Sequence, residues 1–79
     1  MIDYVIKYLE SKLFRVRDIT DNTSIPKSTA NYYLKNPDKL RKANDYNISQ
    51  LYNYFKSLNL DVYKLNQYKR VTTVEFVKE

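Results

Sequence analysis

The chain has 79 residues, of which 43% are hydrophobic and 29% are charged, so we expect one folded domain with a single small core. It has no cysteine and no histidine. This excludes disulfides, thiol or imidazole catalysis, and most zinc and haem sites. The nine acidic residues show neither a paired spacing nor a calcium-loop spacing. We therefore expect a protein that is not an enzyme and holds no metal or cofactor.

The chain is basic, with 14 lysine and arginine residues against 9 aspartate and glutamate residues and a net charge of +5. Most of this excess lies within residues 15–42, which carry seven basic and three acidic residues. A local excess of this kind favours a polyanionic partner. No stretch approaches the roughly 20 apolar residues that a membrane span needs, and the first residues lack a signal-peptide layout. We expect a cytoplasmic protein with no membrane contact.

A first helix is predicted over residues 2–14. Five apolar residues recur there at spacings of three and four, as on one face of a helix: Ile2, Val5, Ile6, Leu9 and Leu13. Tyr4 and Tyr8 flank this stripe, and we expect both at the edge of the core with their hydroxyls in water.

Two shorter helices are predicted to follow. The first covers residues 16–23; the second has Ser24 as its cap and Pro26 in its first turn, and ends at Lys35 before an Asn-Pro pair. By helical spacing, three residues of the second should face the core: Ala30, Tyr33 and Leu34. Four should face outward: Lys27, Ser28, Asn31 and Tyr32.

After a polar connection over residues 38–45, a longer helix is predicted with Asn47 as N-cap, Gln50 reaching back in a capping box, and Tyr46 packed on Leu51. Its predicted core stripe is Ile48, Leu51, Tyr52, Phe55 and Leu58. Because the chain has no glycine, Asn59 is expected in the left-handed conformation that ends this helix.

The C-terminal part is predicted to hold a short helix and a strand. Asp61 can cap the helix, whose inward residues are Val62 and Leu65, and which ends by Gln67. Residues 70–77 are rich in β-branched types and are predicted as a strand. A lone strand has unpaired edges, so it must pair with another chain, fold irregularly onto the helices, or fray. Pairing with another chain would make a dimer with three contact residues: Val71, Val74 and Phe76.

The spacing within residues 16–65 resembles the helix-turn-helix of the phage repressor and Cro-like (XRE-type) family. The positions that carry this resemblance are Ile19-Thr20, Ser24-Ile25, the Ser/Thr-rich residues 26–30, and residues 58–62. The chain departs from the family at Thr20, where alanine is usual, at Ser24, where glycine is usual, and at Ala30, where isoleucine is usual. The turn without glycine leaves two alternatives open: Ser24 occupies the tight position, or Asn22 takes the left-handed position with a shifted register.

The predicted fold class is mainly α: a small helix-turn-helix bundle of four to five helices with a short C-terminal β-strand. Residues 1–67 form the helix-turn-helix domain, and residues 68–79 form a C-terminal strand or tail that is a possible dimerisation element.

The resemblance implies double-stranded DNA as partner, and side-chain chemistry favours the same role. The expected base contacts are Lys27, Ser28, Asn31 and Tyr32. The expected phosphate contacts are Arg15, Arg17, Thr29, Lys35, Lys39 and Arg41, with Lys42 beside them.

The predicted function is a sequence-specific, repressor-like transcriptional regulator of phage or mobile-element type. It would act as a homodimer on a partly palindromic operator, in the host cytoplasm and associated with the nucleoid. The alternative is a small phage-encoded inhibitor that uses the same scaffold to bind a host protein, because some anti-CRISPR proteins resemble this fold and tyrosine, present nine times, is a preferred interface residue.

Overall fold

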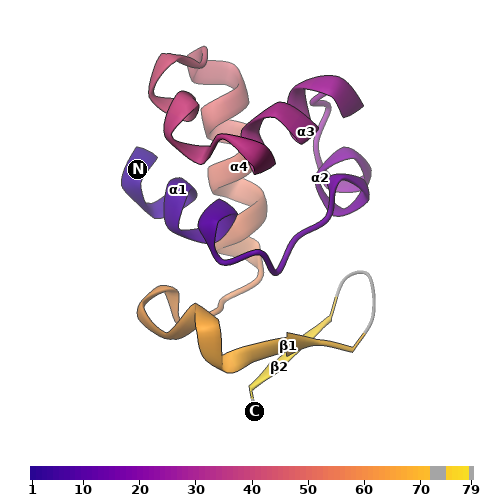
Figure 1. Cartoon of the computed structure of the whole chain (residues 1–79), viewed down its shortest axis with the longest axis vertical. Coiled ribbons are helices and arrows are strands. Elements are labelled where there is room, and N and C mark those ends of the chain that lie inside the picture. Colours follow the sequence, from indigo (N-terminus) through magenta and orange to yellow (C-terminus); the bar gives the residue numbers. More distant parts are fainter. Residues whose placement is uncertain (72–74, 79) are drawn as a thin grey trace.

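The computed structural model describes residues 1–71 and 75–78, and in this part the chain is mainly helical with a two-stranded sheet near the C-terminus (Figure 1). The α-helices are α1 (Ile2–Glu10), α2 (Val16–Asn22), α3 (Lys27–Lys35) and α4 (Asp45–Ser57). Two 3₁₀ helices, η1 (Pro37–Lys42) and η2 (Val62–Gln67), and the strands β1 (Tyr68–Arg70) and β2 (Phe76–Lys78) complete the described elements. The predicted fold class, mainly α with a short C-terminal β element, is confirmed.

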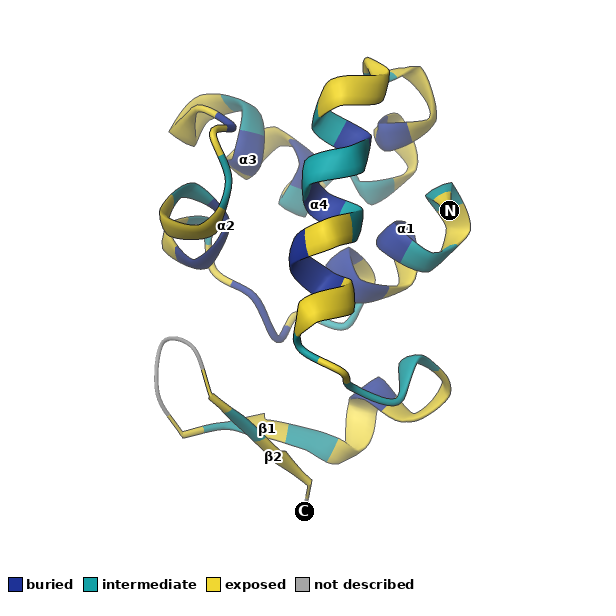
Figure 2. Ribbon diagram, turned by 180° about the vertical axis from the view of Figure 1, so that it is seen from behind, coloured by how far each residue is buried: buried dark blue, intermediate teal, exposed yellow. Residues whose placement is uncertain are grey.

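The core lies between α1 and α4, which pack against each other, and α4 turns its buried residues toward the other helices (Figure 2). Aromatic rings fill its centre: Tyr8 stacks on Phe55 at a centroid distance of 4.8 Å, and Phe14 lies 4.8 Å from Phe55. Each large side chain buried in this way contributes about 1.5–3 kcal/mol. The packing of α1 on α4 is therefore the main support for the smaller helices around it.

Helix α1 ends at Glu10, four residues earlier than predicted. Lys12 has a φ of 62°, and Ser11 Oγ donates a hydrogen bond to the Tyr8 carbonyl at 2.5 Å. Leu13 and Phe14 are still buried, because the chain leaves the helix and places both side chains in the core. Helical periodicity alone does not reveal this exit, since Leu13 also fits the apolar stripe.

The prediction that Tyr8 lies at the edge of the core was wrong. Its side chain is fully buried rather than at the edge of the core. Its hydroxyl donates to the Leu60 carbonyl at 3.2 Å and accepts from the Tyr4 hydroxyl at 3.4 Å, so protein groups replace the expected water. Burial, followed by the hydrogen bond from Tyr4, raises the pKa of Tyr8 above its ordinary value.

Helix α4 begins three residues earlier than predicted. Its N-cap is Asn44, whose side chain accepts from the Asn47 N–H at 2.8 Å, while Tyr46 is exposed. The cap prediction was wrong because Asn44 and Asn47 are both good caps, and the earlier one includes an extra helical turn. Leu40 of η1, within the predicted polar connection, is fully buried.

The end of α4 agrees better with the sequence. Asn59 has a φ of 54°, and the Asp61 side chain accepts from the Tyr63 N–H at 3.0 Å, so both predictions are confirmed. In the core stripe, however, Tyr54 is buried, whereas Tyr52 is only half-buried.

The strand predicted over residues 70–77 is wrong as a single element. Instead, β1 and β2 form an antiparallel hairpin within the chain, with Arg70 opposite Phe76 and Tyr68 opposite Lys78. The partner strand comes from residues just before the β-branched run, so the lone-strand reason for a dimer is removed. Of the three predicted dimer contacts, Val71 is exposed, Phe76 lies 5.0 Å from the Phe14 ring, and Val74 falls outside the described residues.

Candidate nucleic-acid interface

The turn between α2 and α3 covers residues 23–26 and is built without a left-handed residue. Within residues 1–71 and 75–78, only Lys12 and Asn59 have positive φ. The alternative of a left-handed Asn22 was therefore wrong, since Asn22 is simply the last residue of α2, whereas Ser24 lies in the turn without a positive φ. Ser24 does not cap α3 either, because the N-cap position is Pro26.

Side-chain hydrogen bonds hold this turn instead. Thr23 Oγ1 donates to the Ile19 carbonyl at 2.7 Å and accepts from the Ile25 N–H at 3.2 Å. The backbone N–H and the hydroxyl of Ser24 both donate to Gln50 Oε1, at 2.7 and 2.8 Å. Gln50 thus ties the turn to α4 rather than completing a capping box, and Ile25 is buried beneath it.

Helix α3 presents the outward face that its sequence predicts. Ala30 and Tyr33 are buried against the core and Leu34 is half-buried. The outward residues are Lys27, Ser28, Asn31 and Tyr32, all of them exposed. This face belongs to a helix of only nine residues, packed on α2 on one side and on η1 on the other.

Two hollows border this face. One, of about 370 Å³, lies where α2 and α3 begin, and its lining residues are Arg15, Val16, Arg17, Thr20 and Lys27. The other, of about 360 Å³, lies between α3 and η1, and its lining residues are Ser28, Thr29, Tyr32, Tyr33, Lys39, Lys42 and Ala43. Residues of an α-helix are turned about 100° from one another, so Lys27 and Tyr32 lie roughly 140° apart around α3. The hollows therefore border opposite edges of the exposed face, and both contain cationic side chains.

Some of the residues predicted to contact phosphates line these hollows, and others do not. Lys35 is exposed on α3 but lines neither hollow, and the same holds for Asn31, which was predicted as a base contact. Arg41 also lies outside both and donates to Asp3 Oδ1 at 2.6 Å. Lys42, its neighbour, lines the second hollow.

Arg17 lies 3.4 Å from Asp21 one helical turn away, with both side chains exposed. An exposed ion pair of this kind contributes at most about 1 kcal/mol. The pairs of Arg17 and Arg41 are therefore weak enough for another anion to replace the carboxylate.

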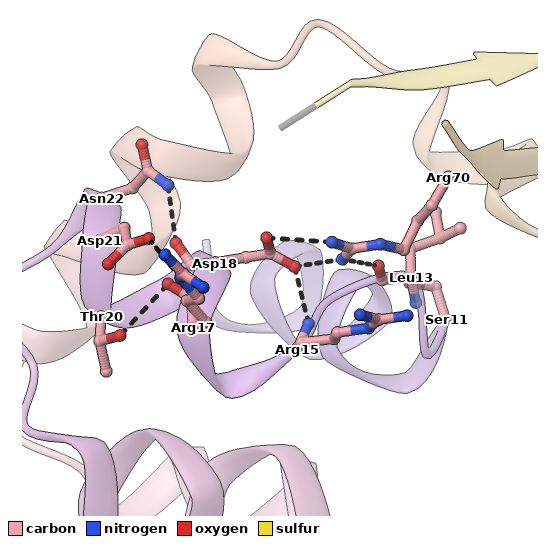
Figure 3. A network of polar contacts seen from close by, with 9 residues as sticks. All are labelled: Ser11, Leu13, Arg15, Arg17, Asp18, Thr20, Asp21, Asn22 and Arg70. Carbon is pink, nitrogen blue, oxygen red and sulfur yellow. Dashed lines mark hydrogen bonds and ion pairs between the residues drawn. The ribbon is translucent and has the colours of Figure 1, made fainter. Parts of the chain in front are cut away.

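The start of α2 is held by a buried ion pair that the sequence did not indicate (Figure 3). Asp18 is fully buried and accepts from the Arg15 N–H at 2.8 Å and from both terminal nitrogens of Arg70 in β1. Arg70 also donates to the Leu13 carbonyl at 2.9 Å. The hydrogen bond to Asp18 raises the pKa of Arg70 above its ordinary value, against the opposing effect of burial.

The only local signal for this arrangement was an acidic side chain at the third residue of α2, which is typical of a capping box. The ion pair between Asp18 and Arg70 fixes the position of the residue that precedes α2. The backbone of Arg15 is fixed from inside, while the Arg15 side chain stays exposed at the first hollow.

Comparison of the chain with protein-family models, with curated proteins and with solved structures gave no match. Among the described residues, no helix is long and apolar enough to cross a membrane. The same residues contain no cluster of three or more side chains suited to hold a metal ion.

Proposed function

We propose that the protein binds double-stranded DNA through α3 and regulates transcription, without a catalytic step or a cofactor. The observation that carries this proposal is the arrangement of one short exposed helix between two cationic hollows. An α-helix with its side chains is about 10–12 Å wide, and the major groove of B-DNA is about 12 Å wide. A helix in that groove has a phosphate backbone on each side, and the two hollows flank α3 in the same way.

The first two turns of α3 carry side chains suited to base edges. Asn31 can make paired hydrogen bonds to adenine, and Lys27 can donate to guanine acceptors. Tyr32 can contact a thymine methyl group, and Ser28 can bond either a base or a phosphate. These side chains are exposed and need no rearrangement of the core to reach a groove.

The hollows supply the phosphate contacts. Arg15 and Arg17 would hold one strand from the start of α2, and Lys39 and Lys42 the other strand from η1. Thr29 adds a hydroxyl on the η1 side. Contacts on both sides would fix the register of α3 along the groove.

As part of the same proposal, the protein acts as a homodimer on a partly palindromic operator of a phage or mobile element, at the nucleoid of the host. Two copies of α3 would then meet successive major grooves, about 34 Å apart on one face of the duplex.

Selection from a pool of randomised duplexes tests sequence-specific binding. The bound fraction is sequenced after selection at several salt concentrations. We expect one enriched motif with two-fold symmetry, and an affinity that falls with salt by a slope of about 0.9 per phosphate contact. An unenriched pool whose binding disappears at physiological salt would contradict the proposal.

That second outcome would favour binding to a host protein, the other candidate function. Its specific support is the exposure of Tyr46 and Tyr63, of which 67% and 82% of the surface is accessible. Tyrosine is enriched among residues that dominate protein interfaces.

A further inference from the structure

A third hollow, of about 350 Å³, lies between the end of α2 and the middle of α4. Its lining residues are Asn22, Gln50, Asn53 and Tyr54, all uncharged, in a chain of which 29% is charged. None of these residues lines either hollow beside α3. Interfaces with other proteins are depleted of charged residues at their centre and enriched in tyrosine.

Two hydrogen-bond donors at this hollow have no partner among the described residues. The Tyr54 hydroxyl and Gln50 Nε2 are both buried and make no hydrogen bond with the part of the chain that the structure describes. The orientation of the Gln50 amide is set, because its Oε1 accepts from both the N–H and the hydroxyl of Ser24. Its NH₂ group must therefore be the unpartnered end.

Both donors come from α4, one turn apart. Four residues of an α-helix rise about 6 Å. Alternate residues of an extended chain, whose carbonyls point to the same side, are about 6.6 Å apart. The repeat of an extended segment therefore matches the spacing of Gln50 and Tyr54 along α4, so that one carbonyl can face each of these residues. Asn22 can accept a hydrogen bond from an N–H of that segment. Its Nδ2 donates to the Asp18 carbonyl at 2.7 Å, which leaves Oδ1 as an acceptor (Figure 3).

The charges around the hollow favour a neutral acceptor over an anion. Burial, followed by the Asp18 carboxylate and more weakly by Asp21, raises the pKa of Tyr54 to about 12, and Arg70 partly offsets this rise. Tyr54 thus keeps its proton, and a carboxylate or phosphate at the same place would be repelled by the two aspartates.

We propose that this hollow, the α2–α4 hollow, binds an extended segment of a partner protein through neutral backbone carbonyls. Both donor atoms are buried, so the side chains that cover them must shift slightly for a bound segment to reach them. A buried donor without an acceptor is unfavourable, and this favours the shift once a carbonyl is present. The inference does not depend on DNA binding, since the hollow shares no lining residue with the α3 face.

An NMR titration of the full chain tests it. The probe is the capped peptide N-acetyl-alanyl-alanine N-methylamide, with acetate as the anionic acceptor and thymidine as a nucleobase bearing carbonyls. We expect the peptide to shift the side-chain NH₂ signal of Gln50 and the backbone signals of Asn22 and Tyr54 to saturation, and acetate and thymidine to do so more weakly. No saturable shift, or a stronger effect of acetate or thymidine, would overturn the proposal.

Variants separate binding from a structural effect. Tyr54→Phe removes one donor and keeps the ring, and Gln50→Glu keeps the acceptor for Ser24 while removing the other donor. Each should weaken peptide binding about tenfold. Tyr52→Phe, a hydroxyl removed from the same helix outside the hollow, should leave it unchanged. If Tyr54→Phe bound the peptide as tightly as wild type does, the proposal would also be overturned. The affinity for DNA should not differ between Tyr54→Phe and wild type.

Discussion

Asn31 and Lys27 are the residues for which we expect base contacts most directly, since both are exposed on α3 and can bond base edges. Replacing Asn31 with alanine should cost about 1–3 kcal/mol in binding to the selected duplex and relax selectivity at one base pair. Competition anisotropy with single-base variants of the duplex measures this. The matched control is Asn53→Ala, an exposed asparagine on α4, which should bind like wild type; equal losses for both variants would exclude a specific role for Asn31.

The buried tyrosines predict an alkaline limit to stability. In the fold, the pKa of Tyr54 rises from 10.0 to about 12, mainly because its hydroxyl is buried, and that of Tyr8 is also raised. Between these values the unfolded chain has lost the Tyr54 proton and the folded chain has kept it. Stability is therefore fully present below pH 10 and falls as the pH rises toward 12.

The urea midpoint measured as a function of pH checks this expectation. Wild type should lose stability across that window, and Tyr54→Phe should lose less because one of the raised groups is gone. A variant with the same pH dependence as wild type would show that Tyr54 titrates normally in the fold.

Which of these residues could be foreseen depends on how local their environment is. The outward face of α3 follows from helical spacing, because neighbours three and four residues away decide which side is buried. Asp18 and Arg70 could not be foreseen, since they are 52 residues apart and each looks like an ordinary surface charge in the sequence. Lys42 and Arg41 are adjacent, and only the path of η1 decides which one enters the hollow.

The hairpin and α2 are joined by the ion pair between Asp18 and Arg70. Breaking a buried pair by removing one partner costs about 3–5 kcal/mol. Asp18→Asn should therefore remove most of the roughly 5 kcal/mol expected for a domain of this size. Chemical denaturation with a double-mutant cycle to Arg70→Gln measures the coupling.

The control for that cycle is Asp21→Asn, which removes the exposed partner of Arg17 in the same helix. It should leave the denaturation midpoint nearly unchanged. Similar losses for Asp18→Asn and Asp21→Asn would mean that the buried pair does not hold α2 in place.

The elements themselves were predictable to different degrees. Residues of α2, α3 and α4 carry clear periodicity, so their existence was foreseen, while their ends moved by up to three residues through caps such as Asn44. The hairpin was missed because Tyr68–Arg70 has no strand-like pattern and pairs only through contact with residues that follow it.

The whole molecule measures 34 × 22 × 21 Å, with α3 in its upper part and the hairpin at the opposite end in Figure 1. A dimer through the hairpin must therefore place the two copies side by side for α3 to reach grooves about 34 Å apart. We expect sedimentation equilibrium to give a dimer that dissociates when exposed Val71 becomes aspartate. That variant should bind a half-site like wild type and the full palindrome more weakly; a wild type that stays monomeric on the palindrome would contradict the dimer.

Neither the net charge of +5 nor the helical fold identifies a partner by itself, because many helical domains are basic. The DNA assignment depends on where the charges lie relative to α3, and this became visible only with the arrangement of α2 and η1 around that helix. A direct test must therefore locate the binding surface as well as detect binding.

The most direct measurement is an NMR titration of the ¹⁵N-labelled protein with a mixed-sequence DNA duplex at low salt, read residue by residue. We expect the largest changes in α3 from Lys27 to Lys35, at Arg15 and Arg17, and at Lys39 and Lys42. Changes centred on α1, α4 or the hairpin, or spread evenly over all lysines, would contradict DNA binding through α3.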